Sequence, residues 1–208
     1  IGVEARSATG PLIVALSDLD LHVRAVAASS LPAVDAPAEQ AVPALTELIR
    51  RDPSVGPIRA LSEYGLEAKP AVPELVRLAS DEQLNSEIRW NAVRTLGKIG
   101  AGAVEAIPVL VEQLKNPIPS IREHAAEALG DLGPAARETA ESLLPLLSDT
   151  VTKVRRDAAR SLGQIQAPPE LAGEPLQRLL KYSEAIVRDA AKTALQSVAP
   201  GRLKAEQT

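Results

Sequence analysis

The apolar residues of this chain recur at the spacing of one helix face, in short stripes that come in pairs. One stripe runs from Ile107 to Leu114, and a second stripe of the same period runs from Ile121 to Leu132. Pro117 and Pro119 lie between them, and proline ends one helix but is tolerated in the first turn of the next. Gly133, which is followed by proline, ends the second helix. The pattern predicts a hairpin of two short helices, which cannot bury both of its stripes alone.

The same pair of stripes returns along most of the chain. One leucine marks each second helix, at Leu31, Leu61, Leu96, Leu129, Leu162 and Leu195, in steps of 30, 35, 33, 33 and 33 residues. A fixed period in this range is typical of a solenoid, in which each unit contacts mainly its neighbours. We therefore predict an all-α fold, an α-solenoid of about six helical hairpins, with units at about residues 10–37, 38–68, 69–103, 104–136, 137–169 and 170–199.

The repeat resembles the HEAT-repeat family, in particular the short bacterial form also found in phycobilisome lyase-like proteins. The resemblance covers about Gly10 to Ala199 and rests on a Val-Arg or Ile-Arg pair that opens the second helix and an acidic residue in the turn before it. The pairs are Val23-Arg24, Ile88-Arg89, Ile121-Arg122, Val154-Arg155 and Val187-Arg188, and the turn residues are Asp18, Asp81 and Asp149, with Asn116 in the fourth unit. The resemblance implies a right-handed superhelix with the second helices on its concave face.

The second unit departs from this pattern. Ser54 stands where the arginine belongs, and Pro53, Gly56 and Pro57 crowd the start of the second helix. We expect this unit to be distorted, which leaves five full units and one irregular one.

The two ends of the chain lie outside the repeat. Residues 1–9 begin without methionine and read as the remnant of a preceding segment, and residues 200–208 read as a polar C-terminal tail.

The amino-acid composition argues against several classes of function. The 208 residues are 45% hydrophobic, with no Phe, Met or Cys, so the expected core is built from Ala, Leu, Val and Ile. The lack of cysteine excludes a disulfide and a cysteine-based metal site or nucleophile. A net charge of −4 argues against a dedicated nucleic-acid binder, and no apolar run reaches membrane-spanning length. The cellular compartment is not fixed by these features.

Catalytic chemistry has little support in the sequence. The two histidines, His22 and His124, are far apart, and neither is followed by Glu as in the di-iron hydroxylases that share HEAT-like repeats. The segment at Gly97-Lys98 does not match a phosphate-binding loop, because Ile99 stands where that motif requires Ser or Thr. We predict no catalytic residue, no cofactor and no metal. Glycines at two repeated positions are expected to serve helix packing (Gly97, Gly130 and Gly163) and helix termination (Gly65, Gly100 and Gly133).

The arginines of the repeated pair form a column that has two interpretations. A basic stripe could bind phosphates, but an acidic or amide residue lies six positions upstream in three units, across the turn between helices. We therefore expect a structural ladder of arginine-to-turn hydrogen bonds, made of Arg24, Arg89, Arg122, Arg155 and Arg188 with Asp18, Asn116 and Asp149.

Two further rows point away from the apolar stripe of the second helices. One row reads Arg94, Glu127 and Arg160, and the other reads Trp90, Glu123, Arg156 and Asp189. The alternating charges are compatible with a solvated salt-bridge ladder or with a strip that recognises a peptide. Trp90, the only tryptophan, is either an interface anchor or a cover over the irregular second unit.

These observations lead to one favoured function and two alternatives. The favoured function is a non-catalytic scaffold or adaptor that binds a protein or peptide partner in its groove, as a monomer. A bilin lyase-like factor for chromophore attachment is the first alternative, implied by the resemblance. A HEAT-like DNA glycosylase is the second, and it requires a basic groove.

Overall fold

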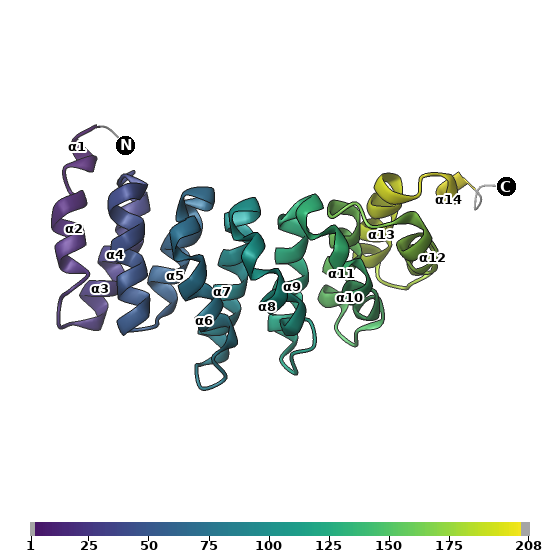
Figure 1. Ribbon diagram of the computed structural model, residues 1–208, viewed down its shortest axis with the longest axis horizontal. Helices are drawn as coiled ribbons and strands as arrows, with labels where there is room; N and C mark the ends of the chain where they lie inside the picture. The colour runs from purple at the N-terminus through teal and green to yellow at the C-terminus, as the bar shows by residue number, and fades with distance from the viewer. Residues whose placement is uncertain (1–2, 205–208) are drawn as a thin grey trace. The chain divides into compact units, whose positions relative to one another are not determined.

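The computed structural model describes residues 3–204, and every regular element in that range is a helix (Figure 1). The first helices of the hairpins are α2 (Thr9–Ala15), α4 (Ala38–Arg51), α6 (Val72–Ser80), α8 (Ile107–Gln113), α10 (Ala140–Leu143) with η4 (Leu144–Ser148), and α12 (Pro169–Leu179). The second helices are α3 (Leu21–Ala33), α5 (Val55–Glu63), α7 (Ser86–Ile99), α9 (Pro119–Asp131), α11 (Thr152–Gln164) and α13 (Ala185–Val198). The predicted all-α solenoid of helical hairpins is confirmed.

Short helices complete the chain. Three 3-10 helices, η1 (Gly65–Ala71), η2 (Gly100–Ala106) and η3 (Gly133–Thr139), connect hairpins, and α1 (Val3–Arg6) and α14 (Gly201–Lys204) lie at the ends. The predicted N-terminal remnant thus includes α1, and its first two residues lie outside the described range. Residues 205–208 of the predicted tail also lie outside it.

The chain forms two compact units, Ile1–Gly102 (unit 1) and Ala103–Thr208 (unit 2). In unit 1, α5 packs between α3 and α7, and in unit 2, α11 packs between α9 and α13. The first helices of neighbouring hairpins contact each other much less than the second helices do. The second helices therefore form the tighter row of each unit, and we call the outward surface of that row the second-helix face.

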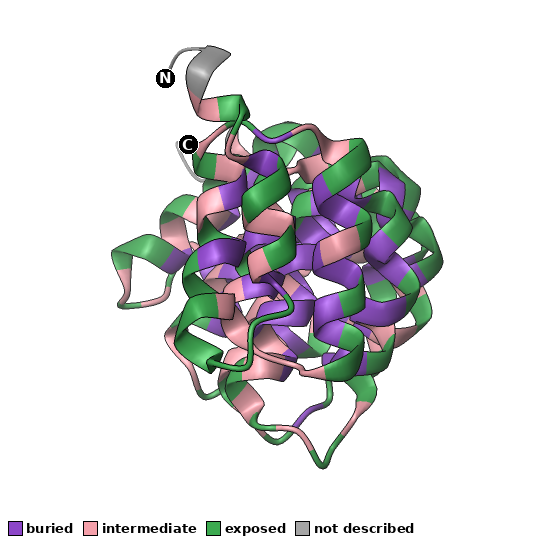
Figure 2. Ribbon diagram, turned by 90° about the vertical axis from the view of Figure 1, so that its left-hand side faces the viewer, coloured by how far each residue is buried: buried purple, intermediate pink, exposed green. Residues whose placement is uncertain are grey.

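The core of each unit is built on the leucine that marks the repeat. Leu31, Leu61 and Leu96 in unit 1 have no exposed surface, and the same is true of Leu129, Leu162 and Leu195 in unit 2. Alanines fill the remaining space between helices, and the buried residues gather where helices face one another (Figure 2). Burying apolar surface contributes about 25 cal/mol per Å², so these leucines and the alanines around them stabilise each unit.

Glycines act at the two repeated positions as the sequence predicts. Gly65, Gly100 and Gly133 have φ angles of 52°, 63° and 64°, the left-handed region that ends a helix. A Cβ added at Gly163 would lie 2.8 Å from the Cα of Ala194, so α11 and α13 approach closely only because Gly163 has no side chain.

The irregular second unit has a shortened second helix. Helix α5 has nine residues, whereas α7 has fourteen. It begins at Val55, one residue after Ser54, whereas the other second helices begin three residues before their arginine. Pro57 therefore lies in the first turn, where its missing N–H would have had no partner within the helix. The distortion is the loss of one helical turn.

Candidate functional site

Three arginines of the repeated pair join one hairpin to the next, and we call this arrangement the arginine relay. Arg122 Nη1 donates to the carbonyl oxygens of Asn116 and Pro117, at 2.8 and 3.1 Å. Its Nε and Nη2 donate to the carboxylate of Asp149 in the next hairpin, at 2.7 and 3.0 Å. The N–H groups on two edges of the planar guanidinium thus bind two different sets of acceptors, a geometry that arginine allows.

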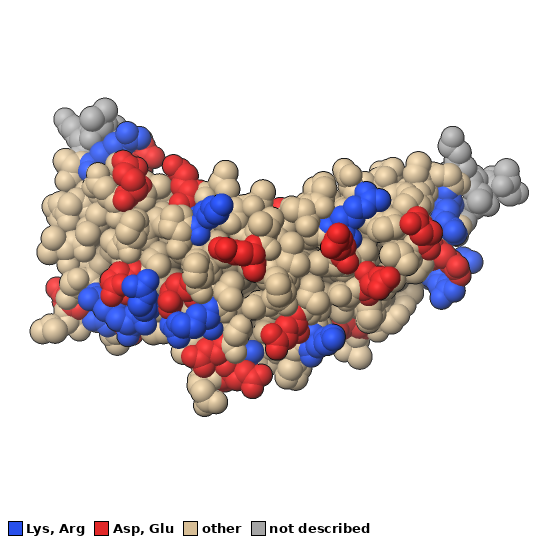
Figure 3. Space-filling model, viewed as in Figure 1, with Lys and Arg blue, Asp and Glu red and all other residues tan. Residues whose placement is uncertain are grey.

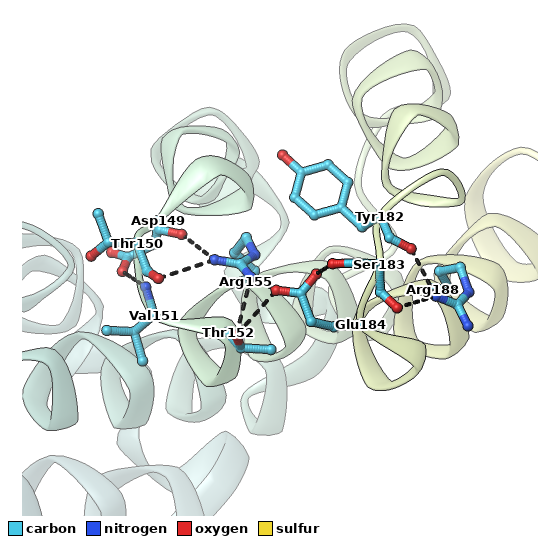
Figure 4. Close-up of polar contacts among 9 residues, drawn as sticks. All are labelled: Asp149, Thr150, Val151, Thr152, Arg155, Tyr182, Ser183, Glu184 and Arg188. Carbon is cyan, nitrogen blue, oxygen red and sulfur yellow. Dashed lines mark hydrogen bonds and ion pairs between the residues drawn. The ribbon is translucent and has the colours of Figure 1, made fainter.

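Of the other four arginines at this position, Arg155 and Arg24 follow the same rule and complete the relay. Arg155 donates to the carbonyl oxygens of Asp149 and Thr150 and pairs with Glu184 (Figure 4). Arg24 donates to the carbonyl oxygen of Asp18 at 2.7 Å and pairs with Asp52. Arg188 donates to the carbonyl oxygens of Tyr182 and Ser183, at 2.7 and 2.6 Å. Arg89 is buried, with 6% of its surface exposed.

The acceptors in the relay differ from those that the sequence suggests. The upstream side chains do not accept from the arginine of their own unit, but stabilise the turn. Asp18, Asn116 and Asp149 accept backbone N–H bonds two residues on, at 2.8, 3.0 and 2.9 Å. The arginine of the same unit bonds the main-chain carbonyl instead. Since the donors are engaged in the turns, the relay favours a structural role over phosphate binding.

Two carboxylates that pair with relay arginines, Asp149 and Glu184, have a lowered pKa. Partial burial acts to raise the pKa of Asp149, but hydrogen bonds from Arg122 and the Val151 N–H, with the charges of Arg122 and Arg155, hold it below 3.8. The pKa of Glu184 is lowered chiefly by a hydrogen bond from Ser183.

On the second-helix face of unit 2, the predicted charges pair with one another. Arg156 lies 3.7 Å from Glu123, and Arg160 lies 3.6 Å from Glu127. Beneath them, Asp157 has a side chain only 2% exposed and lies 2.7 Å from Arg156 and 4.0 Å from Arg160. The hydrogen bonds to Asp157 raise the pKa of Arg156.

Asp157 is the member of this network that the sequence interpretation missed. Its register position is held by Asn91 in α7, and both residues are buried at 1% exposure. The repeated polar residue in the middle of an otherwise apolar stripe was the available signal. Asp189, the last predicted member of the row, lies exposed on α13.

On the second-helix face of unit 1, Trp90 meets a residue of the irregular second unit. The guanidinium carbon of Arg59, on α5, lies 5.9 Å from the centre of the Trp90 ring. Arg59 Nε donates to Asn91 Oδ1 at 3.0 Å, and its Nη2 lies 3.9 Å from Glu87. Arg94 lies half-exposed on the same helix as Trp90. Arg59 holds the register position of Arg94 but was not among the predicted site residues.

A groove lies beside this cluster, between α3 and α5. It has a volume of about 460 Å³. The small and apolar residues of its lining are Ala25, Val26, Pro32, Gly56 and Ala60. Its polar residues are His22, Ser29, Arg59 and Glu63. Val26 is 49% exposed, although it holds the register position of buried Asn91 and Asp157.

Charges of both signs lie close together on the surface shown in Figure 3, without a field of one sign. On this face the mixture differs from the basic groove that a DNA glycosylase requires. Among residues 3–204, no helix is long and apolar enough to cross a membrane, and no three His, Asp or Glu side chains are arranged to hold a metal ion.

Comparison with known proteins agrees with this architecture. The family model for HEAT repeats matches residues 57–130 and again residues 107–196, together more than half of the chain. The chain belongs to the HEAT-repeat family. No curated protein shows a significant match to this HEAT-repeat chain.

Solved structures share the fold over most of their length. An engineered protein is 26% identical, with a TM-score of 0.72, and covers 93% of this chain and 97% of its own. The CpcE and CpcF complex of phycocyanin lyase from Nostoc sp. PCC7120 is 24% identical, with a TM-score of 0.67 and coverage of 91% and 76%. A designed armadillo repeat protein in complex with the peptide (KR)4 is 18% identical, with a TM-score of 0.69 and coverage of 90% and 98%. The last two share the fold alone.

Proposed function

We propose that this HEAT-repeat chain is a non-catalytic scaffold that binds a segment of a partner protein on the second-helix face of unit 1. The groove between α3 and α5 carries this proposal, because it is hollow, partly apolar and bordered by Arg59. Arginine and tryptophan are the residue types that most often dominate binding energy at interfaces, and Trp90 and Arg94 lie on the adjacent helix.

The paired charges of unit 2 support a different role for the rest of the predicted strip. Glu123, Glu127, Arg156 and Arg160 already have partners of opposite charge within unit 2. In this proposal the four residues stabilise unit 2, and unit 1 recognises the partner segment. The designed armadillo protein in complex with a peptide supports the general mode, in which a protein of stacked helical repeats binds a peptide.

The groove can be tested with a random peptide library displayed on phage. Peptides selected on the wild-type protein should lose at least about tenfold in affinity for Ser29→Trp, because that side chain would fill the groove. The matched control is Thr193→Trp, at the same register position on α13, where binding should be unchanged. Peptides that bind Ser29→Trp as tightly as the wild type would contradict the proposal.

Trp90→Ala tests the edge of the same surface. If the bound segment covers the ring, its loss should weaken the selected peptides by about 2 kcal/mol, as at other interface anchors. Isothermal calorimetry measures this change, and circular dichroism checks that the helices remain. Equal affinity would show that Trp90 only covers the shortened α5.

A second candidate function is a lyase-like role in chromophore attachment. The shared fold with the phycocyanin lyase complex is the observation that favours it. Mixing the protein with a bilin and a phycobiliprotein subunit should then produce the absorbance of a bound chromophore, and unchanged spectra would reject this function.

A further inference from the structure

A second pocket of unit 1 continues from the groove. It has a volume of about 400 Å³ and lies where the end of α3 meets the start of α4 and the end of α5. Pro32 and Glu63 line both the groove and this pocket, so the two are neighbours that share part of their lining. A segment that lies in the groove therefore has its next residues close to the pocket.

The pocket is acidic. Four carboxylates line it, from Asp35, Glu39, Glu63 and Glu67, against the single cation of Arg6. Burial, followed by the charges of Asp35 and Glu67, raises the pKa of Tyr64 in the same lining to about 12. The four carboxylates outnumber the one cation, so the net charge of the lining is negative. A cationic group would be stabilised in the same place.

The chain itself shows how a guanidinium fits. Arg6, at the end of α1, donates from Nε to Asp35 Oδ2 at 3.0 Å and makes a second bond from Nη2 to the same oxygen. Asp35 lies in a turn with a φ of 56°, and its N–H bonds the carbonyl oxygen of Pro32. That turn fixes the carboxylate in the lining of the pocket.

A metal ion is the less suitable occupant. Among the described residues, no group of three or more carboxylate or histidine side chains is arranged to coordinate one. Arginine fits better, because its planar fork carries several donors, and Arg6 already directs two of them to Asp35.

We propose that this acidic pocket binds an arginine side chain of the partner segment, while a neighbouring aliphatic side chain of that segment lies in the groove between α3 and α5. The inference rests on the proposed function and adds the chemistry of the partner. In the unbound protein Arg6 occupies part of the pocket, so the partner's arginine competes with it. Charge complementarity at the pocket also sets the register of the segment.

The test uses four capped octapeptides in a two-by-two design. The first half of each carries either Leu and Val or only Gly, and the second half carries either two arginines or two citrullines, which are neutral and similar in shape. Titration into ¹⁵N-labelled protein is followed by amide chemical shifts. The aliphatic arginine peptide should shift the residues of both the groove and the pocket, and its citrulline counterpart should bind about tenfold more weakly.

Variants separate competition from a structural role. Asp35→Asn and Glu63→Gln should each weaken the arginine peptide, whereas Glu47→Gln, an exposed carboxylate of α4 outside the pocket, should not. Arg6→Gln should strengthen binding about twofold to fivefold, because it removes the competitor from an exposed ion pair. A purely structural Arg6 would give unchanged or weaker binding, which would overturn the proposal.

The outcomes also distinguish the two proposals. Equal affinity for arginine and citrulline peptides, together with a loss of binding in Ser29→Trp, would overturn the acidic pocket but leave the peptide-binding groove intact. Binding that is insensitive to Ser29→Trp would overturn the proposed function itself.

Discussion

The second-helix faces of the two units are built from the same repeat but have different surfaces. In unit 2, Arg156 and Arg160 pair with glutamates of α9 and with buried Asp157. In unit 1, the corresponding positions of α3 are Ala25 and Ser29, and the space above them is a groove. The comparison shows that charged residues at two register positions pair across this face in unit 2, whereas small residues at the same positions of α3 line a groove in unit 1.

Reversing the four paired charges of unit 2 is the strongest way to break this comparison. With lysines in place of Glu123 and Glu127 and glutamates in place of Arg156 and Arg160, the two pairs would survive, but both new glutamates would lie beside buried Asp157. We expect the free energy of unfolding to fall by about 3 kcal/mol, the effect of leaving a buried charge unpaired. Urea denaturation measures the change.

Adding Asp157→Asn to the reversed protein should recover most of the lost stability, because the new glutamates would then lie beside a neutral side chain. Exchanging the exposed pair Glu174 and Arg178 on α12 is the matched control, and it should change stability by no more than about 0.5 kcal/mol. If the four-charge reversal left stability unchanged, Asp157 would not hold this face together.

A matched pair of glycine substitutions should give the next largest effect. Gly163→Ala should destabilise the protein by about 2 kcal/mol, because the new Cβ would overlap the backbone of Ala194. Gly56→Ala should stabilise it by about 0.5–1 kcal/mol, because its Cβ would meet Ala25 at no less than 3.7 Å and alanine favours a helix. Thermal or urea unfolding measures both, and effects of the same sign would contradict the difference in packing.

The acid dependence of unit 2 should reflect Asp149. Its folded-state pKa is depressed, so its stabilising effect is complete above the ordinary value of 3.8 and is lost as pH falls through the lower, folded-state pKa. Near neutral pH, the free energy of unfolding of the wild type should be about 1 kcal/mol higher than that of Asp149→Asn. The reason is that the hydrogen bonds between Arg122 and the Asp149 carboxylate are charge-assisted. The difference should vanish in strong acid, and Asp189→Asn controls for the loss of an exposed charge. A difference that is constant with pH would contradict the relay.

Hydrogen exchange should show the smallest difference, at the shortened helix. Amides between Asp52 and Gly65 should open about 1 kcal/mol more readily than those between Ile121 and Leu132, because α5 lacks a turn and the second unit lacks the relay arginine. Uniform protection of the two segments would show that the missing turn has no energetic effect.

The sequence was most informative where one residue type does one task in every unit. The leucine column and the helix-ending glycines follow directly from spacing and backbone conformation, and Ser54 marked the irregular unit. The relay acceptors could not be predicted, because one is a main-chain carbonyl set by the turn and the other is a carboxylate about 28 residues away, such as Asp52 for Arg24.

The candidate site was less visible in the sequence. Its groove depends on how closely α3 and α5 approach, which small residues such as Ala25 and Gly56 permit but do not specify. Arg59 was missed because the irregular second unit concealed its register. Asp157 was missed because its only signal in the sequence is the polar residue Asn91 at the same register position of α7, and that signal does not reveal burial.

The arginine relay also bears on how such a chain can lengthen. Arg122 and Arg155 each take their backbone acceptors from their own hairpin and their carboxylate from the following one, and Asp149 serves as both turn residue and acceptor. A hairpin copied as a whole thus carries a donor for the unit after it and an acceptor for the unit before it. Gene duplication could insert such a copy between similar units without any compensating substitution. The second unit, which has Ser54 in place of the donor, is a poor template for this kind of growth.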